Sequence, residues 1–595
     1  MSIDADADHA QMELENRDWI GGEATDRKHI LRVGPAVALL AVFWAFFIGN
    51  HWVELSQGQR FFSRLGAHAV LFLGFFTWWF MQRSIRLRDR WLAVGVFVLG
   101  SAVMLKLADP SIGVMSIFMT GLPFIFTAWL AAAYLTRSAP PEKQRWAVAA
   151  LILVVLSYFL FVRFDGLDGK QRNEVSWRWS PTAEERFLDK HRSVFHAVAN
   201  SPGRWELQAS DVPAFRGERR DGIVRGTNLA LDWEASPPEQ VWRQPIGPAW
   251  SSLIVVDGHV VTQEQRGAAE VVACYDADTG AEVWVHSDPV RFHEGLSGAG
   301  PRGTPAFDAG RIYALGGMGH LNCLDAETGK QLWTVDLTKE LEAKVPQWGF
   351  AVSPLVVDGR VIVFANAKDG CGPVAFDAST GEQLWKVDAG GETYSSPQLA
   401  ELDGVRQILM HDNRSLRGVR VDDGTVLWEQ PSASEMAVPM LQPNKVGPTR
   451  LLVAIEPGVT LLEVKQSDGE WTVTEQWASN RLKPSFNDFV VHDGKIYGLD
   501  DGILCALDLA TGERLWKKGR YGHGQVLLLP DQNVLLVQGA RGEMVLIGIG
   551  GEQPEELGRF EATEGKTWNH PALVGNRLYV RNGEEIACYE LPVGE

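Results

Sequence analysis

The sequence predicts an α-helical membrane bundle of five transmembrane helices followed by an all-β propeller with eight blades. Three observations lead to this fold class. Apolar segments of helix length fill the first third of the chain, a short motif recurs through the remainder, and each recurrence is surrounded by four strand-like runs. The 595 residues exceed a single core, and the net charge of -18 is spread along the chain, with no feature of a nucleic-acid-binding protein.

The first third of the chain has the composition of a membrane protein. Residues 1–30 are polar and acidic and are expected to form a disordered cytoplasmic tail. The membrane domain is predicted to cover residues 31–164, and its first apolar segment is too long, and lacks the small-residue cleavage site, to be a removable signal peptide. Each of five segments approaches the ~20 residues that cross a bilayer as a helix. They lie at about 31–53, 62–82, 91–108, 111–136 and 146–164.

Basic residues predict the orientation of these segments. They gather in the loops after the second and fourth segments, which the positive-inside rule assigns to the cytoplasm. These residues are Arg83, Arg86, Arg88 and Arg90, then Arg137, Lys143 and Arg145. The N-terminus is therefore expected in the cytoplasm, and five spans would carry the C-terminal part to the periplasmic side of an inner membrane. Tryptophans near the segment ends are expected to anchor in membrane lipid; they are Trp52, Trp78, Trp79, Trp91, Trp129 and Trp146.

Two ionisable residues of the apolar segments carry a functional hypothesis. An ionisable group inside the membrane predicts a functional site, here a quinone or proton site around His68 and Lys106. The alternative is that these side chains extend to the membrane surface.

Residues 165–235 are polar and are expected to form a connector with one short helix and an extended arm. Ser180-Pro181 has the chemistry of a helix start, and residues 182–195 have an amphipathic pattern on which Phe187, Leu188 and Phe195 would pack. Residues 214–222 are expected to be the extended arm that leads into the first blade.

The repeat that defines the C-terminal domain, residues 236–595, is clearest at residues 323–333. Its sequence Asp-Ala-Glu-Thr-Gly-Lys-Gln-Leu-Trp follows a short alternating run, reverses the chain at Thr-Gly, and starts a second run with Trp on one face. Copies occur at 276–284, 377–385 and 508–516, and a degenerate one at 423–428. Each copy follows another strand pair, so one repeat holds the four strands of a propeller blade.

The aromatic residues of the outer strands give the number of blades. They recur at a spacing of about 45 residues, as propeller repeats do. The series is Trp242, Trp284, Trp333, Trp385, Trp428, Trp477, Trp516 and Phe560. The last repeat lacks a closing strand, which residues 240–242 would supply. The ring is therefore expected to close with eight blades, the last built from both ends of the domain, and this closure removes exposed sheet edges.

The tryptophans and cysteines of the repeat are expected to be structural. Blade docking is predicted for Trp242, Trp284, Trp333, Trp385, Trp428 and Trp516. The five cysteines show no Cys-x-x-Cys or haem-attachment spacing. Cys274, Cys323 and Cys588 take equivalent places, where a small apolar side chain would pack inside a blade.

The Asp-x-x-Thr-Gly-x-x-x-Trp units resemble the tryptophan-docking motif of the pyrroloquinoline quinone (PQQ) repeat. That family includes quinoprotein alcohol and glucose dehydrogenases and a non-catalytic outer-membrane assembly lipoprotein. The segments 249–252, 300–305, 348–354, 394–397 and 566–569 are similar to those of bacterial PQQ-binding-like propeller repeat proteins. Five spans before a periplasmic propeller are similar in arrangement to membrane-bound quinoprotein glucose dehydrogenase. The resemblance implies a propeller of the quinoprotein type, and it does not by itself imply an activity.

Candidate binding residues lie in the segments that join each outer strand to the next inner strand. The candidates are Trp250, His293, Glu294, Arg302, Trp348, Tyr394, Asn487, His523, Trp568 and Asn569. Aromatic rings would stack a planar anionic ligand, and Arg302 would pair with its carboxylate. The alternative is structural, because Ser-Pro and Thr-Pro also begin strands and Trp can pack on a neighbouring blade.

Two functions remain open from the sequence. The preferred one is a ligand- or protein-binding scaffold that presents the propeller to a periplasmic protein, a glycan or a small ligand. The alternative is a PQQ-dependent sugar or alcohol dehydrogenase that passes electrons to membrane quinone. Such an enzyme needs Ca²⁺ and a carboxylate base. Glu294, Glu435, Asn487, Asp488 and Asn569 offer suitable oxygens, but no pattern assigns a catalytic or metal-binding residue, and the adjacent cysteine pair of the alcohol enzymes is absent.

Overall fold

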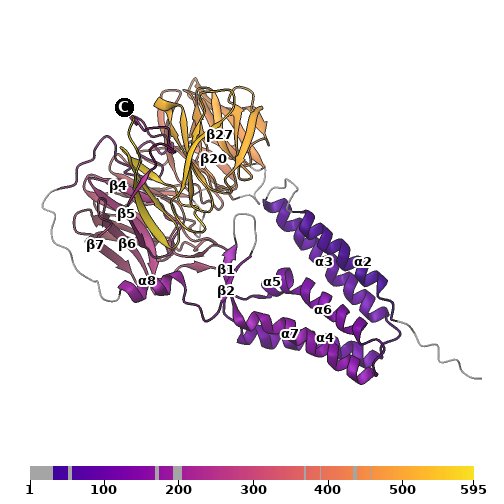
Figure 1. The fold of residues 1–595 in the computed structure, drawn as a ribbon. Coiled ribbons are helices and arrows are strands. Elements are labelled where there is room, and N and C mark those ends of the chain that lie inside the picture. Colours follow the sequence, from indigo (N-terminus) through magenta and orange to yellow (C-terminus); the bar gives the residue numbers. More distant parts are fainter. Residues whose placement is uncertain are drawn as a thin grey trace, which may run out of the picture. The chain divides into compact units, whose positions relative to one another are not determined.

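The computed structural model describes residues 31–50, 57–167, 173–191, 204–367, 370, 372–388, 390–432, 438–455 and 457–594. The chain divides into two compact units, Met1–Arg163 and Phe164–Glu595 (Figure 1). Glu435, Cys371, Phe195 and Trp52 lie outside the described residues.

The first unit is helical. Its elements are α2 (Gly34–Gly49), α3 (Gln57–Met81), α4 (Leu87–Leu107), α5 (Val114–Ser116), the π-helix η1 (Ile117–Gly121), α6 (Leu122–Leu135) and α7 (Pro141–Phe161). Within the described residues, four stretches are long and apolar enough to cross a membrane: Gln59–Met81, Leu87–Leu107, Val114–Leu135 and Pro141–Phe161.

The prediction of five spans is therefore corrected to four candidates. The exception is α2, whose 16 residues would extend about 24 Å, less than the ~30 Å hydrocarbon core. The apolar run of the sequence continues to about residue 53, but the helix ends at Gly49 and is followed by the polar Asn50, whose amide nitrogen donates to the Ser63 hydroxyl over 3.1 Å.

Aromatic packing holds α3 against α6. The rings of Phe75 and Phe126 stack with centroids 4.0 Å apart, and Trp79 meets Trp129 edge-on at 4.9 Å. Trp79 and Trp129 are buried inside the bundle, so they do not anchor in lipid as predicted. Trp91 and Trp146 are exposed on the unit, as interfacial anchors would be.

The second unit contains eight four-stranded antiparallel sheets, which confirms the predicted eight-bladed propeller. Blades 1 to 4 are β4 (Leu253–Val256), β5 (His259–Arg266), β6 (Ala269–Asp276) and β7 (Glu282–Asp288); β10 (Ala306–Asp308), β11 (Arg311–Leu315), β12 (His320–Asp325) and β13 (Gln331–Asp336); β14 (Leu355–Val357), β15 (Arg360–Phe364), β16 (Pro373–Asp377) and β17 (Gln383–Lys386); and β18 (Gln398–Leu402), β19 (Val405–His411), β20 (Ser415–Arg420) and β21 (Val426–Pro431).

Blades 5 to 8 complete the ring. They are β22 (Asn444–Lys445), β23 (Arg450–Ile455), β24 (Gly458–Ser467) and β25 (Glu470–Ser479); β26 (Val490–His492), β27 (Lys495–Asp500), β28 (Ile503–Asp508) and β29 (Arg514–Arg520); β30 (Gln525–Leu529), β31 (Val534–Gln538), β32 (Glu543–Gly548) and β33 (Glu555–Glu561); and β34 (Ala572–Val574), β35 (Arg577–Arg581), β36 (Glu585–Glu590) and β3 (Glu239–Pro245). Smaller elements between the blades are β8 (His293–Glu294), β9 (Gly298–Ala299), α9 (Leu337–Glu340) and η2 (Pro530–Gln532).

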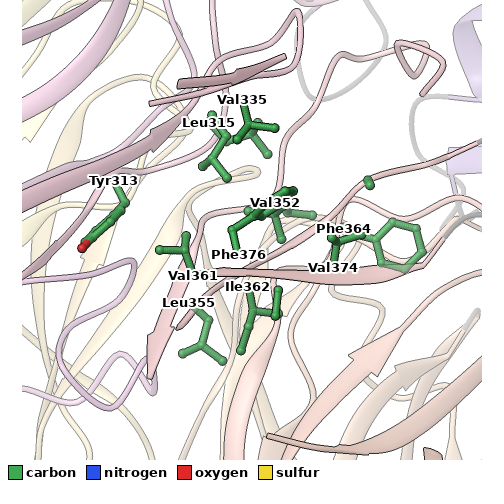
Figure 2. Close-up of a cluster of buried hydrophobic side chains, with 14 of the residues drawn as sticks. Tyr313, Leu315, Val335, Val352, Leu355, Val361, Ile362, Phe364, Val374 and Phe376 are labelled. Atoms are coloured by element: carbon green, nitrogen blue, oxygen red, sulfur yellow. The ribbon is translucent and has the colours of Figure 1, made fainter. Parts of the chain in front are cut away.

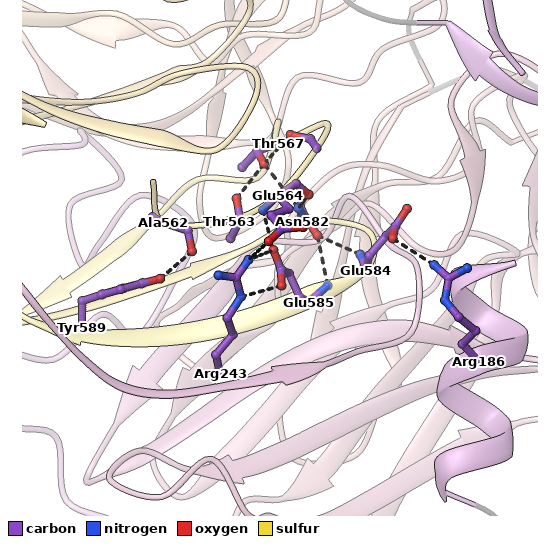
Figure 3. A network of polar contacts seen from close by, with 11 residues as sticks. Arg186, Arg243, Ala562, Thr563, Glu564, Thr567, Asn582, Glu584, Glu585 and Tyr589 are labelled. Carbon is purple, nitrogen blue, oxygen red and sulfur yellow. Dashed lines mark hydrogen bonds and ion pairs between the residues drawn. The ribbon is translucent and has the colours of Figure 1, made fainter. Parts of the chain in front are cut away.

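The ring closes in blade 8 as predicted, with the N-terminal strand β3 paired antiparallel to the last strand β36 (Figure 3). Arg243 on β3 binds the Glu585 carboxylate through two hydrogen bonds of 2.7 and 2.6 Å. Tyr589 on β36 donates to the Ala562 carbonyl over 2.8 Å. The closure thus combines strand pairing with a bidentate ion pair, which is the strong geometry for Arg and carboxylate.

The propeller core lies between neighbouring blades. Figure 2 shows part of the cluster that spans blades 2 and 3, in which Leu315 and Val335 of blade 2 and Val361, Ile362 and Phe376 of blade 3 are buried. Such burial is worth about 25 cal/mol per Å² of apolar surface, so the inter-blade contacts supply the main stabilisation of the ring.

The tryptophan of one blade packs on the Thr-Gly turn of the next. Trp284 donates its indole N–H to the Ala326 carbonyl over 2.9 Å, and a Cβ on Gly329 would overlap the Trp284 ring. Gly329 also has a φ of +66°, so the turn needs glycine for both reasons. The same donor bond joins Trp242 to Ala277, Trp333 to Ala378, Trp385 to Val421 and Trp477 to Leu509.

Trp428 and Trp516 make other contacts. Trp428 donates to the Gln407 side chain of its own blade over 2.6 Å, and Trp516 is buried beside Tyr497 with ring centroids 6.0 Å apart. The thiols of Cys274, Cys323 and Cys588 are free and fully buried opposite Trp284, Trp333 and Trp242.

The connector contains a hairpin, β1 (Val162–Leu167) and β2 (Asn173–Trp177), and the helix α8 (Ala183–His191). Thr182 caps α8, since its hydroxyl accepts the Glu185 N–H over 2.9 Å while the Glu185 carboxylate accepts the Thr182 N–H over 2.7 Å. The predicted start at Ser180-Pro181 is thus two residues early. Phe187 is buried and lies under the Arg266 guanidinium.

Candidate functional site

The site candidates lie in the eight segments that join consecutive blades, here called the join face. These segments are 246–252, 289–305, 337–354, 387–397, 432–443, 480–489, 521–524 and 562–571. In a propeller, the connections from outer to inner strands gather at one end of the ring.

Hydroxyl groups connect neighbouring joins. The Ser252 N–H donates to the Thr304 hydroxyl over 3.1 Å, the Thr304 N–H to the Ser353 hydroxyl over 2.9 Å, and the Ser353 N–H to the Ser396 hydroxyl over 2.9 Å. Thr304, Ser353 and Ser396 each precede a proline that begins an inner strand. The Ser-Pro and Thr-Pro pairs therefore link neighbouring blades. At these positions the structural role, rather than ligand binding, describes the contacts.

One group of predicted site residues surrounds Arg302. Its guanidinium donates to the Glu294 carboxylate over 3.1 Å, to the Ser297 hydroxyl over 2.6 Å and to the Trp348 carbonyl over 3.3 Å. The rings of Trp348 and Tyr394 lie 5.1 Å apart. Arg302 thus already has a carboxylate partner from its own join.

Burial and pairing set the charges of this group. Burial lowers the pKa of Arg302, and the Glu294 carboxylate only partly offsets this. Burial would raise the pKa of Glu294, but hydrogen bonds from Ser297 and Leu296 and the charge of Arg302 outweigh it and hold that pKa below its usual value. Glu294 and Arg302 therefore form an ion pair at neutral pH.

A second group of predicted residues is aromatic. Trp250 and Trp568 have centroids 4.7 Å apart, Trp568 is 5.1 Å from Phe486, and Phe486 stacks on His523 at 5.4 Å. The Trp250 indole donates to the Ser297 carbonyl over 2.8 Å, which links this group to the first.

Polar contacts tie the remaining predicted residues to the same joins. His523 contacts the Asn487 amide oxygen at 3.0 Å, and Asn569 donates to the Ser251 carbonyl over 2.6 Å. His293 lies on β8 with an exposed ring. Eight of the ten predicted residues thus form one connected set of contacts, Asn569 binds the carbonyl of Ser251 beside Trp250, and His293 is exposed.

The connector also contacts the join face. Lys566 lies over Trp250 and Trp568 at 5.7 and 5.0 Å, and its ammonium binds the Glu174 carboxylate of β2 at 2.8 Å. Glu184 of α8 binds the Arg291 guanidinium through contacts of 2.7 and 2.8 Å. The chain's own carboxylates thus pair with two cations of this face.

The feature that the sequence analysis missed is the course of the arm. Residues 212–224 run along the inner strands instead of simply leading into the first blade. Val212 pairs with Val255 of blade 1, the Phe307 N–H of blade 2 donates to the Pro213 carbonyl over 2.8 Å, and the Val224 N–H donates to Leu528 of blade 7 over 2.9 Å.

Residues 215–220 of the arm extend its contacts to four more blades. Arg216 binds Asp488 before blade 6 at 3.1 Å, and Phe215 meets His570 before blade 8 edge-on at 5.1 Å. Arg220 donates to the Ser353 and Pro354 carbonyls before blade 3 over 3.0 and 2.8 Å. Gln398 of blade 4 donates to the Arg219 carbonyl over 3.0 Å. The arm therefore occupies the channel and makes contacts with seven blades.

The arm brings buried charge into the channel. Burial would raise the pKa of Asp488, but Arg216 and His570, the latter 2.8 Å from the carboxylate, lower it below its usual value. Burial and the neighbouring Arg216 lower the pKa of Arg220 to about 9. The sequence signal for the bent course of the arm was the density of Gly and Arg at 216–222. Arg216 and Arg220 adopt positive φ angles of 63° and 56° there.

The residues as arranged do not fit PQQ with Ca²⁺. Arg302 is paired with Glu294, Trp250 and Trp568 stack on each other, and Asp488 is bound by Arg216 of the arm. In the part of the chain that the structure describes, no three His, Cys, Asp or Glu side chains come together as metal ligands. The groups expected to hold a quinone and its cation are engaged with the protein itself.

Fold and joins together define the class of the second unit, an eight-bladed propeller with tryptophan-docked repeats. Residues 268–518 match a family model described as outer membrane protein assembly factor BamB. Over this stretch, which is less than half of the chain, the propeller is similar to the PQQ repeat family.

Relatives with different names match this part of the chain in sequence. BamB of Yersinia pestis is 28% identical over 229 residues, 36% of this chain and 56% of that protein. The quinohemoprotein alcohol dehydrogenase ADH-IIG of Pseudomonas putida is 30% identical over 223 residues, 33% of this chain and 30% of the enzyme. The match thus covers about half of the first relative and less than a third of the second.

Among solved structures, a europium-containing methanol dehydrogenase superposes with a TM-score of 0.50 at 12% identity, over 64% of this chain and 98% of that one. This likeness concerns the fold alone.

Proposed function

We propose that this protein is a membrane-anchored scaffold whose propeller binds a protein partner on the extracytoplasmic side of the inner membrane. The observation that carries the proposal is the occupied channel, because Arg216 and Arg220 of the arm take up the polar groups at its end. Half-buried aromatic side chains remain on the join face, among them Trp250, Trp348 and Trp568. Aromatic residues on a rigid surface are typical of protein interfaces.

The orientation of the propeller follows from α7. The loop before α7 carries Arg137, Lys143 and Arg145, and the loop between α3 and α4 is also basic. The positive-inside rule assigns both loops to the cytoplasm, so a spanning α7 would end outside it and carry the propeller there. This inference holds whether or not α2 crosses the membrane.

The names of the relatives agree with a binding role but do not decide it, since they include an assembly factor and quinohemoprotein dehydrogenases. The second candidate is a PQQ-dependent dehydrogenase that delivers electrons to membrane quinone. It is favoured by the several apolar helices, because a simple tether needs one. The pairing of Arg302 with Glu294 and of Asp488 with Arg216 argues against it.

Photo-crosslinking in cells tests the scaffold. A photoreactive amino acid replaces His293, which is exposed on the join face, and in a matched control it replaces Lys330, which is exposed in the turn between β12 and β13. The proposal predicts a discrete crosslinked protein from position 293 and none from position 330. Equal crosslinking from both positions, or none from 293, would count against the join face as the interface.

A parallel assay addresses the second candidate. The full chain in detergent is titrated with PQQ and Ca²⁺, and dye reduction is followed with a panel of sugars and alcohols. The scaffold predicts no saturable binding and no turnover, whereas saturable binding with turnover would establish the dehydrogenase.

A further inference from the structure

One histidine in the described part of the helical unit is completely buried. His68 on α3 has no exposed surface, and aromatic rings from two other elements surround it. Phe43 of α2 meets it edge-on at 4.9 Å, Phe47 of α2 lies 6.2 Å away, and Phe118 of η1 lies at 5.8 Å. The imidazole is thus held in an apolar environment inside a segment that is apolar enough to cross a membrane.

Both ring nitrogens of His68 face backbone carbonyl oxygens. Nδ1 lies 2.8 Å from the Arg64 carbonyl, and Nε2 lies 2.9 Å from the Met119 carbonyl. A carbonyl oxygen can only accept a hydrogen bond, and a neutral imidazole has one N–H. Both contacts are hydrogen bonds only when the ring carries a proton on each nitrogen.

The sequence explains why the Met119 carbonyl is available. In an α-helix this carbonyl would accept the N–H of the residue four positions later, but that residue is Pro123, which has none. The chain is π-helical at Ile117–Gly121, just before this proline. Proline thus removes the α-helical donor for this carbonyl, and His68 of the neighbouring helix contacts its oxygen.

We infer that His68 is a proton-binding site in the helical unit, where the doubly protonated ring bridges the Arg64 and Met119 carbonyls. Loss of the proton leaves one N–H, so one of the two hydrogen bonds must break. The Arg64 contact lies within α3, whereas the Met119 contact joins α3 to η1. Proton release therefore loosens the contact between these two elements if the remaining N–H stays on Nδ1.

The charges around the ring make the proton conditional. From α3 itself the Arg64 guanidinium lies one turn away, over the Phe47 ring at 5.5 Å, and Arg60 points to the Asn50 carbonyl over 2.7 Å. From α2 and η1, Phe43, Phe47, Phe118 and Met119 face the ring, and none of them is ionisable. Apolar surroundings and the Arg64 charge oppose the imidazolium, and the two carbonyls favour it. Opposed effects of this kind suit a site that gains and loses a proton.

Solid-state NMR of the full chain in lipid bilayers tests the inference. The protein is labelled with ¹⁵N-histidine, and the spectrum of His68→Gln is subtracted from that of the wild type to isolate His68. The expected difference signal at pH 5.5 shows two protonated ring nitrogens and changes reversibly to one protonated and one bare nitrogen as the pH is raised. A difference signal of a neutral ring at every pH from 5 to 8, or one that never titrates, would overturn the proposal.

A second variant tests the role of the proline and also serves if His68→Gln does not fold. Pro123→Ala restores an N–H that can donate to the Met119 carbonyl while leaving His68 in place. The doubly protonated fraction of His68 at pH 5.5 is then expected to fall at least severalfold. An unchanged fraction in Pro123→Ala would show that the Met119 carbonyl does not hold the proton.

Discussion

Glu270 gives the sharpest prediction about the stability of the propeller. It lies on β6, is 3% exposed, and pairs across the strands with Asp288 of β7. The Gly316-Gly317 turn of blade 2 covers its carboxylate so closely that a Cβ on Gly316 would overlap it. Burial, with a smaller contribution from Asp288, raises the pKa of Glu270 to about 8, and backbone N–H groups of Met318 and Gly317 offset only part of this rise. Glu270 is therefore mostly protonated at neutral pH.

The sign of the effect follows from the proton balance. The unfolded chain releases this proton near pH 4.5, and the folded chain keeps it to about pH 8. Protonated Glu270 therefore contributes stability that is complete below pH 4.5 and is lost as the pH rises to 8. At about 1.4 kcal/mol per pH unit, the loss is at most about 5 kcal/mol, and relaxation around buried charges should reduce it to about 2 kcal/mol.

The variant Glu270→Gln keeps the shape and removes the titration. Thermal unfolding of the full chain in detergent, followed by the β-sheet circular dichroism signal, should give the same Tm as the wild type at pH 4.5. At pH 8 the variant should unfold a few degrees higher. Glu555→Gln, at an exposed position of β33, is the control and should show no such pH dependence. A Tm difference for Glu270→Gln that does not change with pH would refute the reasoning.

Three further predictions concern ring closure, blade docking and the thiols. Arg243→Met removes the bidentate pair with Glu585 and should lower the free energy of unfolding by about 1 to 3 kcal/mol in the same assay. The control Arg577→Met, whose partner Glu590 is half exposed, should lower it by less than about 1 kcal/mol, and equal losses would contradict the closure role of Arg243. Gly329→Ala combines a positive φ with overlap of the Trp284 ring and should lower the free energy of unfolding by about 3 kcal/mol or more. The control Gly359→Ala, with a similar φ of +70° and open space around the new Cβ, should lower it by about 1 kcal/mol, and similar losses for both variants would argue against docking of Trp284 on the turn. Four thiols are buried, those of Cys274, Cys323, Cys505 and Cys588, and burial raises the pKa of Cys323 to about 11. Mass spectrometry should therefore find maleimide on none of these four in the folded protein and on all of them after denaturation, and labelling of the folded protein at these positions would contradict their burial.

Local chemistry made the propeller predictable from the sequence. The Thr-Gly turn requires a positive φ at positions such as Gly329, and the tryptophan recurs on one face of the following strand, so each copy marks a blade even without a structure. The missing outer strand of the last repeat then required the N-terminal segment with Trp242. The first apolar segment was harder, because its hydropathy continues past the end of α2 at Gly49 and does not show where the helix stops.

The course of the arm and the pairing within the join face depend on the closed ring. Arg216 and Asp488 are far apart in the sequence and meet only because the arm crosses the channel. From the sequence, Arg302 is expected to be available to bind an anion. In the structure, the turn at Ser297 places the Glu294 carboxylate beside the Arg302 guanidinium. Buried ion pairs of this kind give no periodic signal, so the sequence identified the residues of the face but not their partners.

Hydrogen exchange measures whether residues 212–224 stay bound to the blades. The full chain in detergent is followed by mass spectrometry with and without PQQ and Ca²⁺, for peptides that cover residues 212–224. We predict that the amides of Val212 and Val224, which donate to Val255 and Leu528, exchange as slowly as those of blade strands and that PQQ and Ca²⁺ do not change their exchange. Fast exchange of this segment, or its release from protection when PQQ and Ca²⁺ bind, would contradict a channel filled by the chain's own arm.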